Sequence, residues 1–328
     1  MNPSQASLVL AAVLGLAVRP VMAAEPLTIA VPWAEGSSAM TDLRAAGREV
    51  ARRTEGGIRL RFVEQPAPSA DASAWDGALL AGPCLLRYSE AARVYAMPLF
   101  FRSAAEAAAH RPRMERRIAA DLEAQGFASV ALLDLGFAYL HGRRPLHTVE
   151  RFRAGRLWAP AGAGEMHNLA RELGVTAVAL ETDAVREALR EGAVDVVLTA
   201  PLAAIVLRWH TAFAYVADTP VMHLAGAVVL RDGVLDGWDE AAKETLRETL
   251  ARAFAAAAGD LRKREAEALE VLAESGVERH PLGRTAEERA EWAAWAEAAA
   301  DRLAAGEFFP AELLDEVRAE RDRLRAAP

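Results

Sequence analysis

The residue types that usually perform catalysis occur in this sequence without the spacing that catalysis requires. No serine lies in the Gly-x-Ser-x-Gly frame that exposes a nucleophilic oxygen in α/β hydrolases. Gly162-Ala163-Gly164 lacks the third glycine and the acidic partner of a dinucleotide site, and a turn before a helix at Glu165 explains it better. No two histidines have the i, i+4 spacing of a metalloprotease helix. We therefore expect no catalytic residue, no metal ligand and no cofactor.

Charge and cysteine content exclude further classes of function. The chain carries a net charge of -8, so its exterior should repel both the phosphates of nucleic acid and anionic lipid headgroups. Cys84 is the only cysteine, which excludes an internal disulfide and a multi-thiolate metal site. We expect Cys84 to be a small buried side chain.

The N-terminus has the pattern of a signal peptide. Residues 8–18 form an unbroken apolar run, too short for a membrane span, which needs about 20 residues. Val21-Met22-Ala23 supplies the small residues of a cleavage site, with cleavage after Ala23 or Ala24. The alternative is a buried N-terminal helix, but the polar start at Glu25 coincides with the break in hydrophobicity. We expect residues 1–23 to be removed and the mature chain to be periplasmic, without membrane insertion.

Short apolar strands alternate with amphipathic helices along the rest of the chain, a pattern typical of α/β domains with largely parallel sheets. The predicted strands are residues 27–31, 58–62, 77–81, 130–135, 156–159, 176–180, 193–198, 213–216 and 224–230. The predicted helices are residues 40–53, 103–125, 165–173, 184–190, 202–209 and 238–275, with two more near the C-terminus. A chain of this length usually forms more than one core, so we expect two lobes. The helix over 238–275 would be close to 60 Å long and should bridge them.

Several segments, taken in order, resemble the DctP-type solute-binding proteins of tripartite ATP-independent periplasmic (TRAP) transporters. The segments that carry the resemblance are 27–32, Ala96-Met97-Pro98-Leu99-Phe100-Phe101-Arg102, 149–160, 188–195 and 215–230. The resemblance covers residues 27–281 and implies a two-lobed, type II-like periplasmic binding protein with the ligand between the lobes. By analogy, the first lobe comprises residues 24–135 plus 222–262, and the second comprises residues 136–221 plus 263–328.

The resemblance also implies that a ligand-binding arginine is missing. The family strand that ends at the equivalent of Pro160 usually carries an arginine that pairs with a carboxylate of the ligand. Here that position holds Trp158, and a shift of one residue would assign Leu157 or Ala159 instead. Arg156, two positions away on the same face of the strand, is the alternative source of a guanidinium.

Other candidate ligand-binding residues lie at strand ends or in loops that should face the space between the lobes. Thr199 lies near the place where the family often has an Asn or Glu that faces the ligand. The remaining candidates, each of which could equally be an ordinary packing residue, are Trp33, Ser37, Trp75, Leu80, Tyr139 and Met222. We expect Asp195 to serve the structure of the hinge, and Trp292 and Trp295 to be core residues.

These observations predict a receptor that binds a small organic solute and delivers it to the membrane permease subunits of a TRAP transporter. Because the arginine is missing, the solute should be partly apolar or aromatic. Two alternatives use the same fold: a periplasmic enzyme, and a binding domain that serves a sensor or scaffold.

Overall fold

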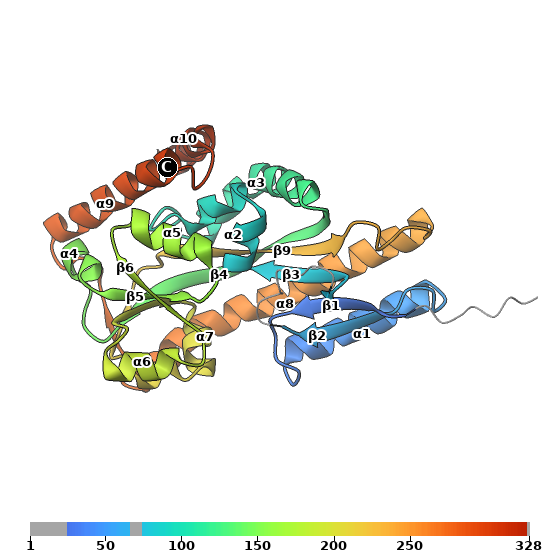
Figure 1. The fold of residues 1–328 in the computed structure, drawn as a ribbon, viewed down its shortest axis with the longest axis horizontal. Helices are drawn as coiled ribbons and strands as arrows, with labels where there is room; N and C mark the ends of the chain where they lie inside the picture. Colours follow the sequence, from blue (N-terminus) through green and yellow to red (C-terminus); the bar gives the residue numbers. More distant parts are fainter. Residues whose placement is uncertain (1–24, 66–73, 327–328) are drawn as a thin grey trace, which may run out of the picture.

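The computed structural model describes residues 25–65 and 74–326, so the predicted signal segment 1–23 lies outside the described residues. Within those ranges the strands join in one mixed sheet with helices on both faces (Figure 1). The strands are β1 (Leu27–Val31), β2 (Leu60–Glu64), β3 (Gly77–Ala81), β4 (Phe127–Gly142), β5 (Arg156–Pro160), β6 (Thr176–Leu180), β7 (Val196–Thr199), β8 (Tyr215–Ala217), β9 (Met222–Arg231) and β10 (Glu278–His280). The α-helices are α1 (Ser38–Arg53), α2 (Pro83–Tyr88), α3 (Ala104–Ala124), α4 (Val149–Arg153), α5 (Gly164–Glu172), α6 (Val185–Glu191), α7 (Pro201–Val206), α8 (Glu240–Glu274), α9 (Ala286–Ala305) and α10 (Ala311–Ala326). Two 3-10 helices are η2 (Ala91–Ala96) and η3 (Trp209–Thr211).

The sheet consists of two halves that share β4. The strand order is β2-β1-β3-β9-β4-β7-β5-β6, with β8 and β10 beside the second half. The first part of β4 pairs with β9, and its last residues, from Tyr139 to Gly142, pair with β7. The pairing of β4 with β9 shifts register between Asp134 and Phe137, and Gly136 between them has φ of 90°. A glycine is suited to this left-handed backbone because it has no Cβ.

Each half of the sheet is covered on both faces. In the first half, α1 and the start of α8 cover one face, where Leu43, Val50 and Phe254 pack on Ile29 and Leu79. The helices α2, η2 and α3 cover the other face (Figure 1). In the second half, α6, α7 and the end of α8 pack on one face, and α4, α5 and α9 on the other. The alternation of strands and helices therefore predicted the fold class correctly.

The long helix α8 contacts both halves, as the sequence predicted. It is capped by Asp239, whose side chain accepts a hydrogen bond from the backbone N of Ala242 at 2.7 Å. Its 35 residues extend about 52 Å at 1.5 Å per residue. It packs on α1 and β4 at one end and on α7 and β10 at the other. No helix in the described part of the chain is long and apolar enough to cross a membrane.

The two C-terminal helices contact different halves of the sheet. Helix α9 lies against α4 and α5, whereas α10 lies against α3. Nε2 of His110 on α3 lies 3.0 Å from the carbonyl oxygen of Val317, and Arg325 pairs with Glu106 at 2.8 Å. The C-terminal hairpin therefore joins the two halves on the side away from α8 (Figure 1).

The main difference from the predicted elements is the length of β4. The sequence predicts a strand over 130–135, but β4 continues to Gly142 because it changes partner from β9 to β7. The predicted capping box at Ser103 is half formed: Ser103 accepts from the backbone N of Glu106 at 3.2 Å, whereas the Glu106 carboxylate accepts from Arg102. Helix α9 has the complete box, formed by Thr285 and Glu288.

Candidate solute-binding site

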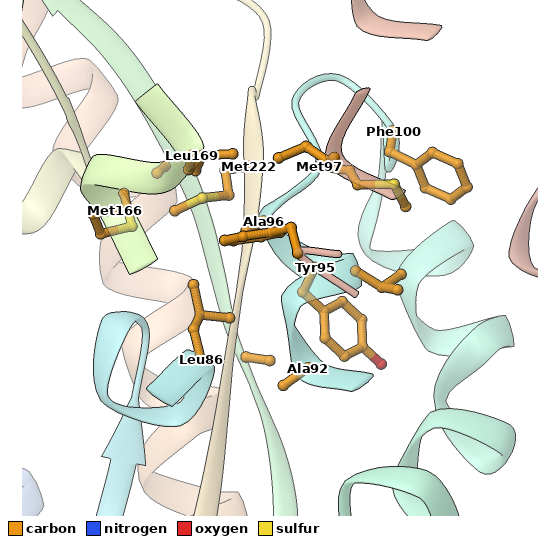
Figure 2. Packing of buried hydrophobic residues seen from close by; sticks show 14 of the residues in the cluster. Leu86, Ala92, Tyr95, Ala96, Met97, Phe100, Met166, Leu169 and Met222 are labelled. Carbon is orange, nitrogen blue, oxygen red and sulfur yellow. The ribbon is translucent and has the colours of Figure 1, made fainter. Parts of the chain in front are cut away.

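A small apolar cavity lies where η2, β5, β9 and α5 meet, and residues from both halves of the sheet line it. Its volume is about 20 Å³. Its lining is wholly apolar or aromatic and includes Ala96, Pro98, Trp158, Met166, Leu169 and Met222. Figure 2 shows Met166 and Leu169 of α5 facing Ala96 and Met222, with Leu86 of α2 beside them.

The size of this cavity has a consequence for binding. One water needs about 10–15 Å³ of such volume, so about 20 Å³ has room for little more than one water. The cavity as it stands therefore has no room for an organic solute.

Trp158 is fixed in the middle of β5 by two contacts. Its Nε1 donates to the carbonyl oxygen of Leu180 at 3.0 Å, and its ring meets Trp209 edge to face with centroids 4.9 Å apart. The side chain is partly buried and packs on the apolar cluster that contains Trp209, whereas its neighbours Leu157 and Ala159 pack on the opposite face of β5, toward α5. Met222 belongs to the cluster on the other face, so its side chain does not pack with the Trp158 ring.

Tyr139 and Thr199 are neighbours close to Trp158. They are directly paired across the antiparallel β4 and β7, and both are partly buried. Tyr139 and Trp158 pack against the same apolar cluster, which contains Trp209. Burial raises the pKa of the Tyr139 hydroxyl, so it stays protonated and can donate a hydrogen bond. The carbonyl oxygen of Thr199 accepts from Nε2 of His141 at 3.2 Å.

Trp33 and Ser37 lie on the other half of the sheet, between β1 and α1. The Trp33 ring packs on Phe254 of α8, with centroids 5.8 Å apart. Ser37 is the N-cap of α1, and its hydroxyl oxygen accepts from the backbone N of Met40 at 3.2 Å. Neither residue lines the cavity at Trp158, and the N-cap bond gives Ser37 a structural role.

Trp75 is a core residue at the opposite end of β3 from α2. It is 1% exposed, and its ring stacks on Phe127 with centroids 5.5 Å apart. Leu80 is also fully buried in this core. The structure therefore does not bring Trp75 together with Trp158.

Arg156 is held against Asp195 at the start of β5. Its Nε lies 2.8 Å from Oδ2 of Asp195 and its Nη2 lies 3.1 Å from Oδ1, which makes a bidentate pair. Nη2 also donates to the carbonyl oxygen of Gly192. The hydrogen bond from Arg156 lowers the pKa of Asp195. Arg156 does not line the cavity at Trp158, and Asp195 joins β5 to the turn before β7.

The sequence prediction missed three residues that this arrangement makes important. Met166 and Leu169 of α5 line the cavity, but their helix shows only an apolar face in the sequence. Glu265 of α8 is a partly buried carboxyl beside the cluster around Tyr139, and it accepts from the backbone N of Leu202 at 2.9 Å. Burial raises its pKa to about 7.

Glu265 should make stability depend on pH. Burial raises its pKa from an ordinary 4.5 to about 7, so the folded chain holds this proton more tightly than the unfolded chain. Its contribution is therefore fully present below about pH 4.5 and is lost as the pH rises through about 7. The upper limit of this loss is about 3 kcal/mol.

The Glu265→Gln variant tests this expectation, because Gln keeps an acceptor for Leu202 but does not ionise. Thermal unfolding of both proteins should give similar Tm values at pH 4.5 and a higher Tm for the variant at pH 8. Parallel Tm curves across this range would show that Glu265 does not titrate as described.

Solved structures define the class of fold. A TRAP periplasmic solute-binding protein from Ralstonia eutropha, with bound (S)-2-acetolactate, matches with a TM-score of 0.77 and 16% identity over 91% of this chain and 99% of that chain. One from Ochrobactrum anthropi, with its C-terminus in the ligand-binding pocket, matches with a TM-score of 0.76 and 20% identity over 92% and 95%. One from Chromohalobacter salexigens, with bound D-glucuronate, matches with a TM-score of 0.76 and 16% identity over 90% and 99%. The fold is that of the periplasmic solute-binding proteins.

The family is shown by the sequence itself. Residues 71–307 match the DctP family model, described as bacterial extracellular solute-binding protein, family 7. The chain belongs to this family, so it is a solute receptor and not an enzyme. The sequence resemblance is confirmed. No curated protein matches the chain.

Proposed function

We propose that this chain is the periplasmic receptor of a TRAP transporter for a small organic solute that is partly apolar or aromatic. The observation that carries the proposal is Trp158, which takes the place of the family arginine on β5 and whose ring packs on Trp209 in an apolar cluster. Tyr139 and Thr199 lie beside it and supply the few polar groups that would orient the solute.

The solutes bound in solved structures of similar proteins differ from the solute class proposed for this chain. These solutes include orotic acid, D-glucuronate and pyroglutamic acid, each of which is an acid. In this chain, the position where the family usually has a carboxylate-binding arginine holds Trp158, and Arg156 is engaged by Asp195. A hydrogen bond to a charged group contributes roughly 1.5–3 kcal/mol, so simple acids should bind about ten- to a hundred-fold more weakly without it.

We also propose that the solute enters by a hinge motion between two lobes, residues 24–135 plus 222–262 and residues 136–221 plus 263–328. The register shift around Gly136 in β4 supports a hinge at that point. Helix α10 packs on α3, so the last residues of the chain contact the first lobe, although α9 lies on the second lobe. Opening would then strain the contacts between α10 and α3.

Mass spectrometry of the solute that co-purifies with the mature protein tests the solute class. We expect a small molecule with an apolar or aromatic portion. A small dicarboxylate or 2-oxo acid bound in stoichiometric amount would contradict the proposal, and so would chemical conversion of the solute by the purified protein.

Reconstitution with the permease subunits encoded beside this chain tests the partner. The receptor with its solute should stimulate uptake, and the ion gradient should drive it without ATP. A solute that binds tightly but stimulates no uptake with those subunits would separate the binding function from the transporter.

A further inference from the structure

We propose that a second cavity, where α3, β4, β9 and α8 meet, binds a small carboxylate that carries a hydroxyl group. Its volume is about 220 Å³, compared with about 20 Å³ for the cavity beside β5. It shares no lining residue with the cavity at Trp158. Its polar lining residues are Tyr95, Arg111, Asp134, His223 and Arg262.

The two arginines can hold a carboxylate. Arg111 donates from Nη2 to the carbonyl oxygen of Leu132, and its Nε lies 4.0 Å from Glu115. Arg262 donates from Nη1 to the carbonyl oxygen of Asp134 at 3.0 Å. A guanidinium has five N–H donors, so each arginine keeps donors for a ligand, and its planar shape suits bidentate pairing with a carboxylate.

Asp134 cancels only part of this positive charge. Its Oδ1 accepts from the backbone N of Gly136 at 2.9 Å and from Nε2 of His223 at 3.0 Å. Burial acts to raise the pKa of Asp134, but these hydrogen bonds outweigh it and the pKa is lowered overall. Asp134 is thus an ionised group, and its Oδ2 lies 3.7 Å from Nε of Arg262, so two guanidinium groups and one carboxylate leave one unit of positive charge at the cavity.

His223 has a buried nitrogen that a ligand could satisfy. The residue is 6% exposed, and its ring lies between Tyr95 at 4.9 Å and Phe137 at 5.1 Å. Its Nε2 is bonded to Asp134, whereas its Nδ1 is buried and has no hydrogen-bond partner among the described residues. Buried polar atoms in folded proteins are almost always paired. A ligand hydroxyl can pair with Nδ1, because a hydroxyl both donates and accepts, once the side chains that cover this atom move aside.

The remaining wall favours a ligand with a small apolar part over a bare inorganic ion. It is formed by Ala107, Ala108, Leu132, Leu133 and Ala225. A hydroxycarboxylate of a few carbon atoms combines the three features that the cavity requires. These are a negative planar head for the arginines, a donor for His223 and a short apolar portion.

Calorimetric titration with glycolate, and with its neutral analogue glycolamide, tests the proposal. We expect saturable binding of glycolate and none of glycolamide. Arg111→Gln and Arg262→Gln should each weaken glycolate binding at least tenfold. The control Arg116→Gln removes an exposed arginine of α3 that has no ion pair within the described residues, and it should leave binding unchanged.

Two further measurements distinguish the two cavities and check that the variants are folded. Trp158→Ala should not change glycolate binding, because Trp158 lines only the other cavity. Thermal unfolding without ligand shows whether each arginine variant is folded, and Arg262→Lys gives a variant that keeps the charge but loses bidentate pairing. Three results would overturn the second site. They are glycolate binding that survives in both folded Gln variants, glycolate binding that is lost in Trp158→Ala, and glycolamide binding as tight as that of glycolate.

Discussion

Replacing Trp158 by Ala is expected to weaken binding of the natural solute by a hundred-fold or more. A tryptophan offers about 150–250 Å² of surface, and burial of apolar surface contributes roughly 25 cal/mol per Å². Trp158 lies in the middle of β5 with its indole held by Leu180 and Trp209, so its ring is ordered before the solute arrives. Calorimetry with the co-purified solute, or the loss of its thermal shift, measures the effect.

The Trp158→Phe variant is the matched control for this experiment. It keeps an aromatic face but loses the hydrogen bond from Nε1 to Leu180. We expect it to retain most of the affinity, because apolar contact is the proposed source of binding. If small dicarboxylates or 2-oxo acids shift the Tm strongly, and Trp158→Ala does not reduce the shift, the proposed solute class is wrong.

Replacing Trp292 by Ala is expected to cost about 3–5 kcal/mol of stability, the usual range for large-to-small changes of a buried aromatic residue. Trp292 is 2% exposed and packs against Phe152 and Trp295, with ring centroids 5.7 and 5.4 Å away. Its Nε1 donates to the carbonyl oxygen of His147 at 2.9 Å, which ties α9 to the segment before α4. Because folded proteins have only about 5–15 kcal/mol of stability, denaturant unfolding should show a large decrease.

The neighbouring tryptophan gives the control for this stability prediction. Trp295 belongs to the same cluster, but its Nε1 is buried without a hydrogen-bond partner in the described ranges. Trp292→Phe leaves the His147 carbonyl unpaired and should cost about 1–3 kcal/mol more than Trp295→Phe, which removes an unsatisfied group. Equal losses in the two Phe variants would show that the bond to His147 contributes nothing.

The strand that carries Trp158 could be predicted from local information, because a short apolar run ends at Pro160 and the structure has β5 there. That Trp158 takes the place of the family arginine stays a prediction. The alternative at Arg156 could not be judged in the same way. Asp195 follows Arg156 by 39 residues, and only the parallel pairing of β5 with β7 brings the two side chains together.

The positions of Trp75 and Met166 depend on contacts that the sequence does not show. Trp75 precedes a strand, and its place in the core depends on Phe127, which follows α3 in the chain. Met166 lies on an apolar helix face, and the sequence does not show which part of that face meets Ala96 and Met222. The raised pKa of Glu265 also could not be predicted from the sequence, because it depends on the burial of one turn of α8 beside α7.

The position of β9 in the sheet affects how a chain made from its N-terminus can fold. This strand lies between β3 and β4, although it follows both of them in the sequence. Until residues 222–231 are available, β3 and β4 each have an unpaired edge, and such edges can pair with other chains. Contacts between segments so far apart also form slowly. A chain with this topology can complete neither its first half-sheet nor the cover of α8 until residues 222–274 are available, so it is most open to aggregation before that point.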